Sequence, residues 1–195
     1  MKRVGLKITL LIGLLFVGQM AGAELPRVGS LVPAVSVQRG GEIMLGKGGD
    51  IRQPWQVQWP QSRPQLIIHV AGRLAAKQQL DPVVTRLART PWVNQQVGLT
   101  TIVNTDDSIW GSQPFVEHSI LNSKKNAPSS HFVLDSSGVV AHQWHLQPES
   151  AAVIATTAKG QIIFFQQAPF SAANIDQLLD RLQLTVKSDL NSSFH

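Results

Sequence analysis

Charged side chains follow two apolar segments of the chain, and their types suit the binding of a ligand or a cation. Arg73 comes shortly after the apolar run at residues 66–70, and Asp106 and Asp107 follow residues 98–104. A guanidinium is a planar group with five N–H donors, which suits a carboxylate or a phosphate. The two carboxylates could bind a cation, activate a water or pair with Arg73. They could instead cap the next turn or helix.

Three further residues join this candidate set. Glu149 and Ser150 precede the apolar segment at residues 151–156, and Trp110 lies shortly after the two aspartates. An exposed Trp110 would favour a binding surface, whereas a buried one would anchor the loop. Ligands of open α/β sheets gather at the carboxyl ends of parallel strands. We therefore predict one binding edge, formed by Arg73, Asp106, Asp107, Trp110, Glu149 and Ser150.

The absence of cysteine limits the chemistry of the protein. None of the 195 residues is a cysteine, which excludes disulfides, thiol catalysis, thiolate metal sites and bacterial lipoprotein lipidation. The serines offer no replacement nucleophile, because the sequence lacks the Gly-x-Ser-x-Gly elbow of serine hydrolases. We expect no cofactor and no catalytic residue of these types.

The histidines could form a metal site only if distant segments met. His142 and His145 are spaced to share a helix face, and His131 and His118 are the nearest further candidates. A zinc site needs three or four ligands in tetrahedral geometry. Local spacing supplies two, so we expect exposed or core histidines and no metal centre. His69 lies within an apolar run, and we expect it to make a satisfied structural hydrogen bond.

The first 23 residues have the pattern of a secretory signal peptide. Three basic residues stand among the first seven positions, an apolar stretch fills residues 8–17, and Ala21-Gly22-Ala23 precedes Glu24. We predict cleavage between Ala23 and Glu24; the alternative is an uncleaved anchor. Cleavage would remove three basic residues and no acidic ones, so the net charge would fall from +5 to +2. A net charge of +2 does not indicate a nucleic-acid-binding protein.

The rest of the chain alternates between strand and helix patterns. Short apolar runs bounded by turn residues indicate strands, and an apolar stripe after Ser171 indicates a last helix. We expect strands at residues 34–38, 42–45, 66–70, 98–104, 132–134, 151–156 and 161–165, and helices at residues 74–89, 113–126, 139–146 and beyond 171.

This order predicts an α/β fold with a central mixed sheet, built as βαβ and then ββα. Flanking helices and an N-terminal β-hairpin extension complete it. One domain would span residues 24–186, followed by a flexible polar tail at residues 187–195.

The residues along these elements resemble the YtfJ family of bacterial periplasmic proteins. The matches lie within residues 29–184, and the resemblance implies a periplasmic protein with a thioredoxin-like fold of the peroxiredoxin and TlpA-type branch. The motifs that carry it are His69-Val70-Ala71-Gly72-Arg73, Ile102-Val103-Asn104-Thr105-Asp106-Asp107, Ser123-Lys124-Lys125, the segment 132–139, Trp144 and the segment 149–153.

Both redox hallmarks of thioredoxin-like proteins are missing from this sequence. The Cys-x-x-Cys position falls on Arg73-Leu74-Ala75-Ala76, and the position of the cis-proline falls near Ser150-Ala151. Thiol–disulfide exchange and thiol peroxidase activity both require sulfur, so they are excluded. We therefore expect a non-redox binding or protein-interaction module.

The partner of such a module would be a periplasmic protein or a small ligand, with membrane contact only through an uncleaved signal segment. Two alternatives stay open: a cysteine-independent enzyme such as a metal-assisted hydrolase using Asp106, Asp107 and a histidine, and a stress-related, chaperone-like protein.

Overall fold

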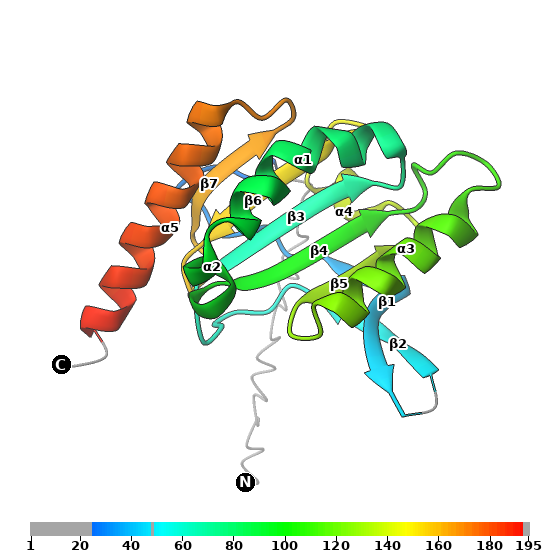
Figure 1. The fold of residues 1–195 in the computed structure, drawn as a ribbon, viewed down its shortest axis with the longest axis horizontal. Helices are drawn as coiled ribbons and strands as arrows, with labels where there is room; N and C mark the ends of the chain where they lie inside the picture. The colour runs from blue at the N-terminus through cyan, green and yellow to red at the C-terminus, as the bar shows by residue number, and fades with distance from the viewer. Residues whose placement is uncertain (1–24, 48, 193–195) are drawn as a thin grey trace, which may run out of the picture.

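The computed structural model describes residues 25–47 and 49–192, so the predicted cleavage site at Ala23 and Glu24 lies outside it (Figure 1). The described chain forms seven strands and five helices. The strands are β1 (Ser36–Gly46), β2 (Gly49–Gln56), β3 (Gln65–Ala71), β4 (Gly98–Asn104), β5 (His131–Asp135), β6 (Ala151–Thr156) and β7 (Ile162–Gln167). The helices are α1 (Leu74–Ala88), α2 (Pro91–Gln96), α3 (Gln113–Asn126), α4 (Val139–Gln143) and α5 (Ala172–Ser192).

All seven strands belong to one mixed sheet. Their order is β2-β1-β5-β4-β3-β6-β7. Strands β3, β4 and β5 are parallel, and every other neighbouring pair is antiparallel. The central mixed sheet that the sequence predicts is therefore confirmed. The parallel strands direct their carboxyl ends to one edge, where the loops after β3 and β4 meet.

Helices cover one face of this sheet. Every residue of β3 and of β6 is buried, so these central strands need cover on both sides. Figure 1 shows α1 and α3 crossing the near face of the sheet and α5 beside β7. Their apolar stripes pack on alternate strand residues, for example Leu80 and Leu178 against Ile68 and Val153 in one cluster. This burial is the main source of the stability of the fold.

The opposite face has less helical cover. Among the helices of residues 25–47 and 49–192, only α4, with five residues, lies on this side. The fully buried indole of Trp144 follows α4 and packs with Val35, Ile102 and Ile154. Its Nε1 donates a hydrogen bond to the carbonyl oxygen of Pro33 at 3.0 Å. The extended chain near Pro33 thus covers part of this face, where a second helix would otherwise be needed.

The N-terminal hairpin forms from other residues than we expected. The sequence analysis placed two strands on either side of Gly40 and Gly41, but both glycines lie within β1. They form a bulge with φ values of +92° and +74°, which only glycine adopts readily. The partner strand is β2, which the analysis missed. The bulge lets β1 pair with β5 on one side and β2 on the other.

The last helix also differs at its end. Ser171 caps it as predicted, because its Oγ accepts a hydrogen bond from the backbone N–H of Asn174 at 3.1 Å. The helix continues to Ser192, whereas we expected a flexible tail from residue 187. Val186 extends the buried stripe one turn beyond Leu182 and explains the greater length. None of the helices in the described ranges is long and apolar enough to cross a membrane.

The bulge gives a test of this topology. A Cβ added to Gly41 would collide with the carbonyl oxygen of Gln53, whereas one added to Gly111, at a similar φ of +81°, would meet nothing within 4 Å. We expect Gly41→Ala to lower the free energy of unfolding by about 3 kcal/mol and Gly111→Ala by about 1 kcal/mol. Urea denaturation measures both. Equal losses would contradict the tight β1–β2 packing at this bulge.

Candidate functional site

The loops that carry the predicted site residues are hydrogen-bonded to one another at one edge of the sheet. The backbone N–H of Gly72, which follows β3, donates to the carbonyl oxygen of Asn104 at 2.7 Å. On the other side of β3, the N–H of Ala71 donates to the carbonyl oxygen of Ser150 at 3.0 Å. The loops after β3 and β4 and the segment before β6 are therefore held together at the carboxyl ends of the parallel strands.

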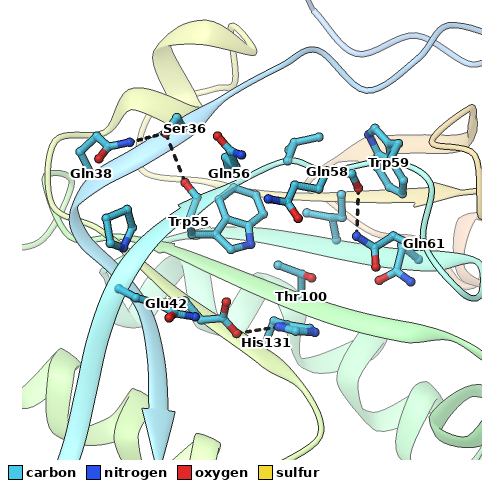
Figure 2. Close-up of a pocket in the computed structure, with 15 residues that line it drawn as sticks. Ser36, Gln38, Glu42, Trp55, Gln56, Gln58, Trp59, Gln61, Thr100 and His131 are labelled. Atoms are coloured by element: carbon cyan, nitrogen blue, oxygen red, sulfur yellow. Dashed lines mark hydrogen bonds and ion pairs between the residues drawn. The ribbon is translucent and has the colours of Figure 1, made fainter.

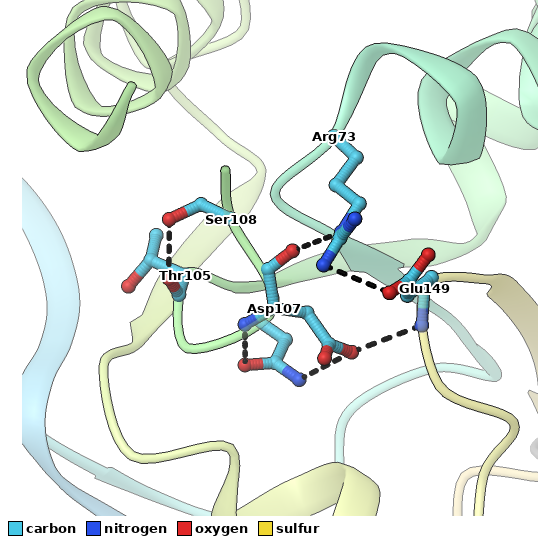
Figure 3. A network of polar contacts seen from close by, with 6 residues as sticks. Arg73, Thr105, Asp107, Ser108 and Glu149 are labelled. Atoms are coloured by element: carbon cyan, nitrogen blue, oxygen red, sulfur yellow. Dashed lines mark hydrogen bonds and ion pairs between the residues drawn. The ribbon is translucent and has the colours of Figure 1, made fainter. Parts of the chain in front are cut away.

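Arg73 connects the loop after β4 to the segment before β6 (Figure 3). Its Nε donates to the carbonyl oxygen of Asp107, and one terminal nitrogen lies 2.9 Å from a carboxylate oxygen of Glu149. The ion-pair partner of Arg73 is thus Glu149, whereas we had considered a pair with Asp106 or Asp107. The pair is partly exposed, and such pairs contribute about 1 kcal/mol at most. Its main effect is to fix where the guanidinium points.

Asn104 organises the loop after β4, and the sequence analysis did not select it. The side chain is buried at the end of β4. Its Oδ1 accepts the backbone N–H groups of Asp106 and Asp107 at 3.0 and 3.4 Å. Its Nδ2 donates to the Asp107 carboxylate at 3.1 Å. An asparagine directly before two aspartates is a common turn-forming pattern, and that pattern could have identified it.

Glu149 occupies an unusual backbone conformation. Its φ is +57°, in the left-handed region that residues other than glycine seldom adopt. The conformation directs its N–H to the Asp107 carboxylate at 3.1 Å while its own carboxylate meets Arg73. Left-handed backbone at a residue with a Cβ costs roughly 1 kcal/mol or more. Two polar contacts from this one residue offset the strain.

The remaining predicted residues lie at the edge without joining the contacts of Arg73. The carboxylate of Asp106 is exposed and has no partner among the described residues. Ser150 is buried, and its Oγ donates to Gln79 of α1 at 3.2 Å. The side chain of Trp110 is 98% exposed, so it does not anchor its loop.

A buried histidine lies behind this edge. His69 in β3 is 1% exposed, and its Nε2 has no hydrogen-bond partner among the described residues, contrary to the satisfied bond we expected. Burial lowers the pKa of His69 to about 4, although the negative charges of Asp135 and Asp107 act in the opposite direction. His69 is therefore neutral at pH 7, and protonating it in the folded protein is unfavourable.

The other histidines do not converge. His118, His142 and His145 are exposed, and Nδ1 of His131 lies 2.6 Å from a carboxylate oxygen of Glu42. Within residues 25–47 and 49–192, no group of three His, Asp or Glu side chains is placed to hold a metal ion. The carboxylate of Asp107 is already engaged by Asn104 and by the N–H of Glu149. Its contacts are those of a structural group.

The comparison with known protein families assigns this chain to a family. A family model described as "Bacterial protein of unknown function (YtfJ_HI0045)" matches residues 27–185. The chain belongs to the YtfJ family. A protein of Escherichia coli strain K12, described as "Uncharacterized protein YtfJ", is 31% identical over 173 residues, which cover 89% of this chain and 94% of that protein. Membership in the YtfJ family assigns no activity, because the family is described as one of unknown function.

Solved structures confirm the thioredoxin-like fold. The chain is similar to a protein of Bacteroides thetaiotaomicron provisionally described as a protein disulfide isomerase, with a TM-score of 0.56 and 12% identity over 90% of this chain and 100% of that one. It is also similar to the 2-Cys peroxiredoxin of Plasmodium vivax, with a TM-score of 0.53 and 11% identity over 82% and 98%. At such low identity, these neighbours establish the fold alone.

Asn104 gives a direct test of how the edge is held. Asn104→Ala removes the acceptor of two backbone N–H groups and the donor to Asp107, so we expect it to lower the free energy of unfolding by about 2–3 kcal/mol. Asn122→Ala on the exposed side of α3 is the matched control, with a change within about 0.5 kcal/mol. Urea denaturation compares them. Similar stability of the two variants would show that Asn104 does not organise the loop.

The buried histidine predicts a pH dependence of stability. Because the folded pKa of about 4 lies below the unfolded value of 6.5, the unfolded chain binds the proton first as the pH falls. Stability from this group is complete above pH 6.5 and is lost towards pH 4. Between about pH 7 and about pH 4.5 we expect it to fall by about 2.5 kcal/mol more in the wild-type protein than in His69→Gln.

Urea denaturation at both pH values measures this difference, and His118→Gln, at an exposed position, is the control. An equal fall in wild-type protein and His69→Gln would show that the buried imidazole does not resist protonation.

Proposed function

We propose that the protein is a non-redox binding module, exported to the periplasm, whose carboxyl edge around Arg73 holds a protein partner. The signal-peptide pattern of residues 1–23 supports export. The absence of cysteine removes the thiol chemistry for which relatives of this fold use the same edge. A binding role needs no sulfur and uses the groups that are present.

The exposure of Trp110 is the observation that carries this proposal. A side chain that is 98% exposed gains nothing from burial in this chain, and a tryptophan is among the residues that contribute most when a partner covers them. Other large apolar side chains are exposed on the segments that follow β3 and β4. They are Leu74, Ile109 and Phe115. Apolar side chains grouped in this way are typical of protein-interaction surfaces.

Arg73 adds a polar contact to this surface. Two of its N–H donors are used by Asp107 and Glu149, and the others have no partner among the described residues. A guanidinium held in a fixed direction suits a backbone carbonyl or a carboxylate of a bound protein. An apolar anchor beside a directed cation is a common arrangement in interface hot spots.

The two alternatives receive unequal support. The described residues offer a metal-assisted hydrolase no cluster of three ligands around Asp106 and Asp107. The exposed apolar side chains also fit a chaperone-like protein, which would bind many unfolded chains. Selectivity separates this role from a module with a defined partner.

Co-purification from periplasmic extract tests the proposal. We expect the protein to retain a defined partner that Trp110→Ala retains at least about thirtyfold more weakly, because truncating a hot-spot tryptophan removes about 2 kcal/mol or more. Leu184→Ala, which truncates an exposed apolar residue of α5, is the matched control and should retain the partner fully. Competition with a reduced, unfolded protein would reveal chaperone-like binding. Equal retention by both variants would place the interaction on another surface.

A further inference from the structure

A cavity opens at the end of the sheet where β3 and β5 begin (Figure 2). Its volume is about 510 Å³, within the range of small-molecule pockets. Gln65 and His131, the first residues of β3 and β5, line it. Arg73 follows the last residue of β3, so the length of this strand separates the cavity from the proposed protein-binding edge.

Two parts of the chain form the walls of this cavity. Thr100 of β4 and the side chains of Glu42 and His131 line the side formed by the sheet. The end of β2 and the connection to β3, residues 55–61, cover the other side and supply Trp55 and Trp59. Both indoles are half-buried against the cluster around Trp144, which limits their motion.

The lining is polar but carries little charge. Glu42 and His131 are its only ionisable side chains among the described residues, and they pair with each other at 2.6 Å. No lysine or arginine lines the cavity there, so it offers no cation to a phosphate or a carboxylate ligand. The remaining polar groups are hydroxyls and glutamine amides, which can both donate and accept hydrogen bonds.

Several of these neutral groups have no partner within the described chain. The hydroxyl of Thr100 and the amides of Gln53, Gln56 and Gln58 make no hydrogen bond to protein. Thr100 as a residue is 7% exposed, and it lines the cavity. Unpaired groups around a hollow are what a ligand rich in hydroxyls or amides would satisfy.

We propose that this cavity binds a neutral saccharide. A sugar ring has a flat C–H face and an edge of hydroxyl groups. The indole of Trp55 offers a rigid apolar surface for the C–H face, and Trp59, whose ring packs on Gly160, extends the same wall. The amides and Thr100 offer partners for the hydroxyls. The amide-rich lining, which has no lysine or arginine, fits a neutral glycan, with or without acetamido groups, better than an anion.

Saturation-transfer NMR of the protein with maltotriose and with N,N′,N″-triacetylchitotriose tests this assignment and distinguishes a plain glucan from an N-acetylated one. We expect saturable transfer to the ring C–H protons of at least one of the two sugars at millimolar concentration. Trp55→Ala should weaken that binding about tenfold or more. Thr100→Val, which keeps the shape and removes the hydroxyl, should weaken it about fivefold.

One control and one further variant complete the test: the control separates the cavity from the protein-binding edge, and the further variant, Gln58→Ala, should weaken sugar binding. Trp110→Ala also removes a tryptophan, but at the carboxyl edge, so it should bind the sugar as the wild-type protein does. Gln58→Ala changes an exposed lining residue, and it tests the site if Trp55→Ala fails to fold. The assignment is overturned if neither sugar gives saturable transfer, if Trp55→Ala and Thr100→Val bind as the wild-type protein does, or if blocked trialanine displaces the sugar equally well.

Discussion

Burial of the central strands on both faces is the constraint on which the rest of the structure depends. Strands β3 and β6 have no exposed residue, so each face of the sheet needs a cover. Helices α1, α3 and α5 supply one cover in full. The other face has only the short α4, and extended chain near Pro33 and residues 55–59 must complete it around Trp144. The cavity lies between residues 55–61 of this cover and strands β4 and β5.

The same strands carry different chemistry at their two ends. At the carboxyl ends, a buried asparagine and two backbone bonds hold Arg73 and Glu149 in fixed positions, next to segments with exposed apolar side chains. At the amino ends, the lining of the cavity carries little charge and contains tryptophans and amides. The first end suits a surface of another protein, and the second suits a small polar molecule. One sheet positions both the carboxyl edge and the cavity, because parallel strands have all their carboxyl ends at one edge of the sheet and all their amino ends at the other.

Much of the fold could be predicted from the sequence because apolar runs and helical stripes are local signals. Strands β3 and β4 and helices α1 and α3 lie within two residues of their predicted bounds. The β1–β2 hairpin was misplaced because Gly40 and Gly41 have the composition of a turn, and only pairing with β5 shows that they form a bulge. Turn composition does not distinguish these two uses of glycine.

The sequence predicts at which edge of the sheet the candidate site residues lie, but it does not predict which of them contact one another. Topology brings Arg73, Asp107 and Glu149 to one edge, yet which carboxylate meets the guanidinium depends on the left-handed backbone of Glu149. The cavity was missed altogether, because Trp55 and Thr100 are distant in the sequence and a glutamine-rich segment has the composition of a loop. Residues that are distant in the sequence meet only when the sheet is packed, so their spacing along the chain does not predict such a cavity.

The presence of Arg73 at the start of α1, in a chain without cysteine, has an electrostatic consequence that connects Arg73 to Glu149. The first turn of a helix carries a partial positive charge, and in redox proteins of this fold that charge stabilises a thiolate. Here Arg73 is the N-cap residue of α1, and no acidic residue lies in the first turn. A guanidinium at this place adds to the positive potential, so the position needs an anion more than it does in the redox proteins. The carboxylate of Glu149 supplies it at 2.9 Å.

Because the side chain of Glu149 is 59% exposed, this anion lies at the surface, where a carboxylate of a bound protein could replace it at the same guanidinium. The edge therefore keeps the preference for negative charge that the fold provides, and in the proposed binding role this preference would serve recognition in place of thiol chemistry.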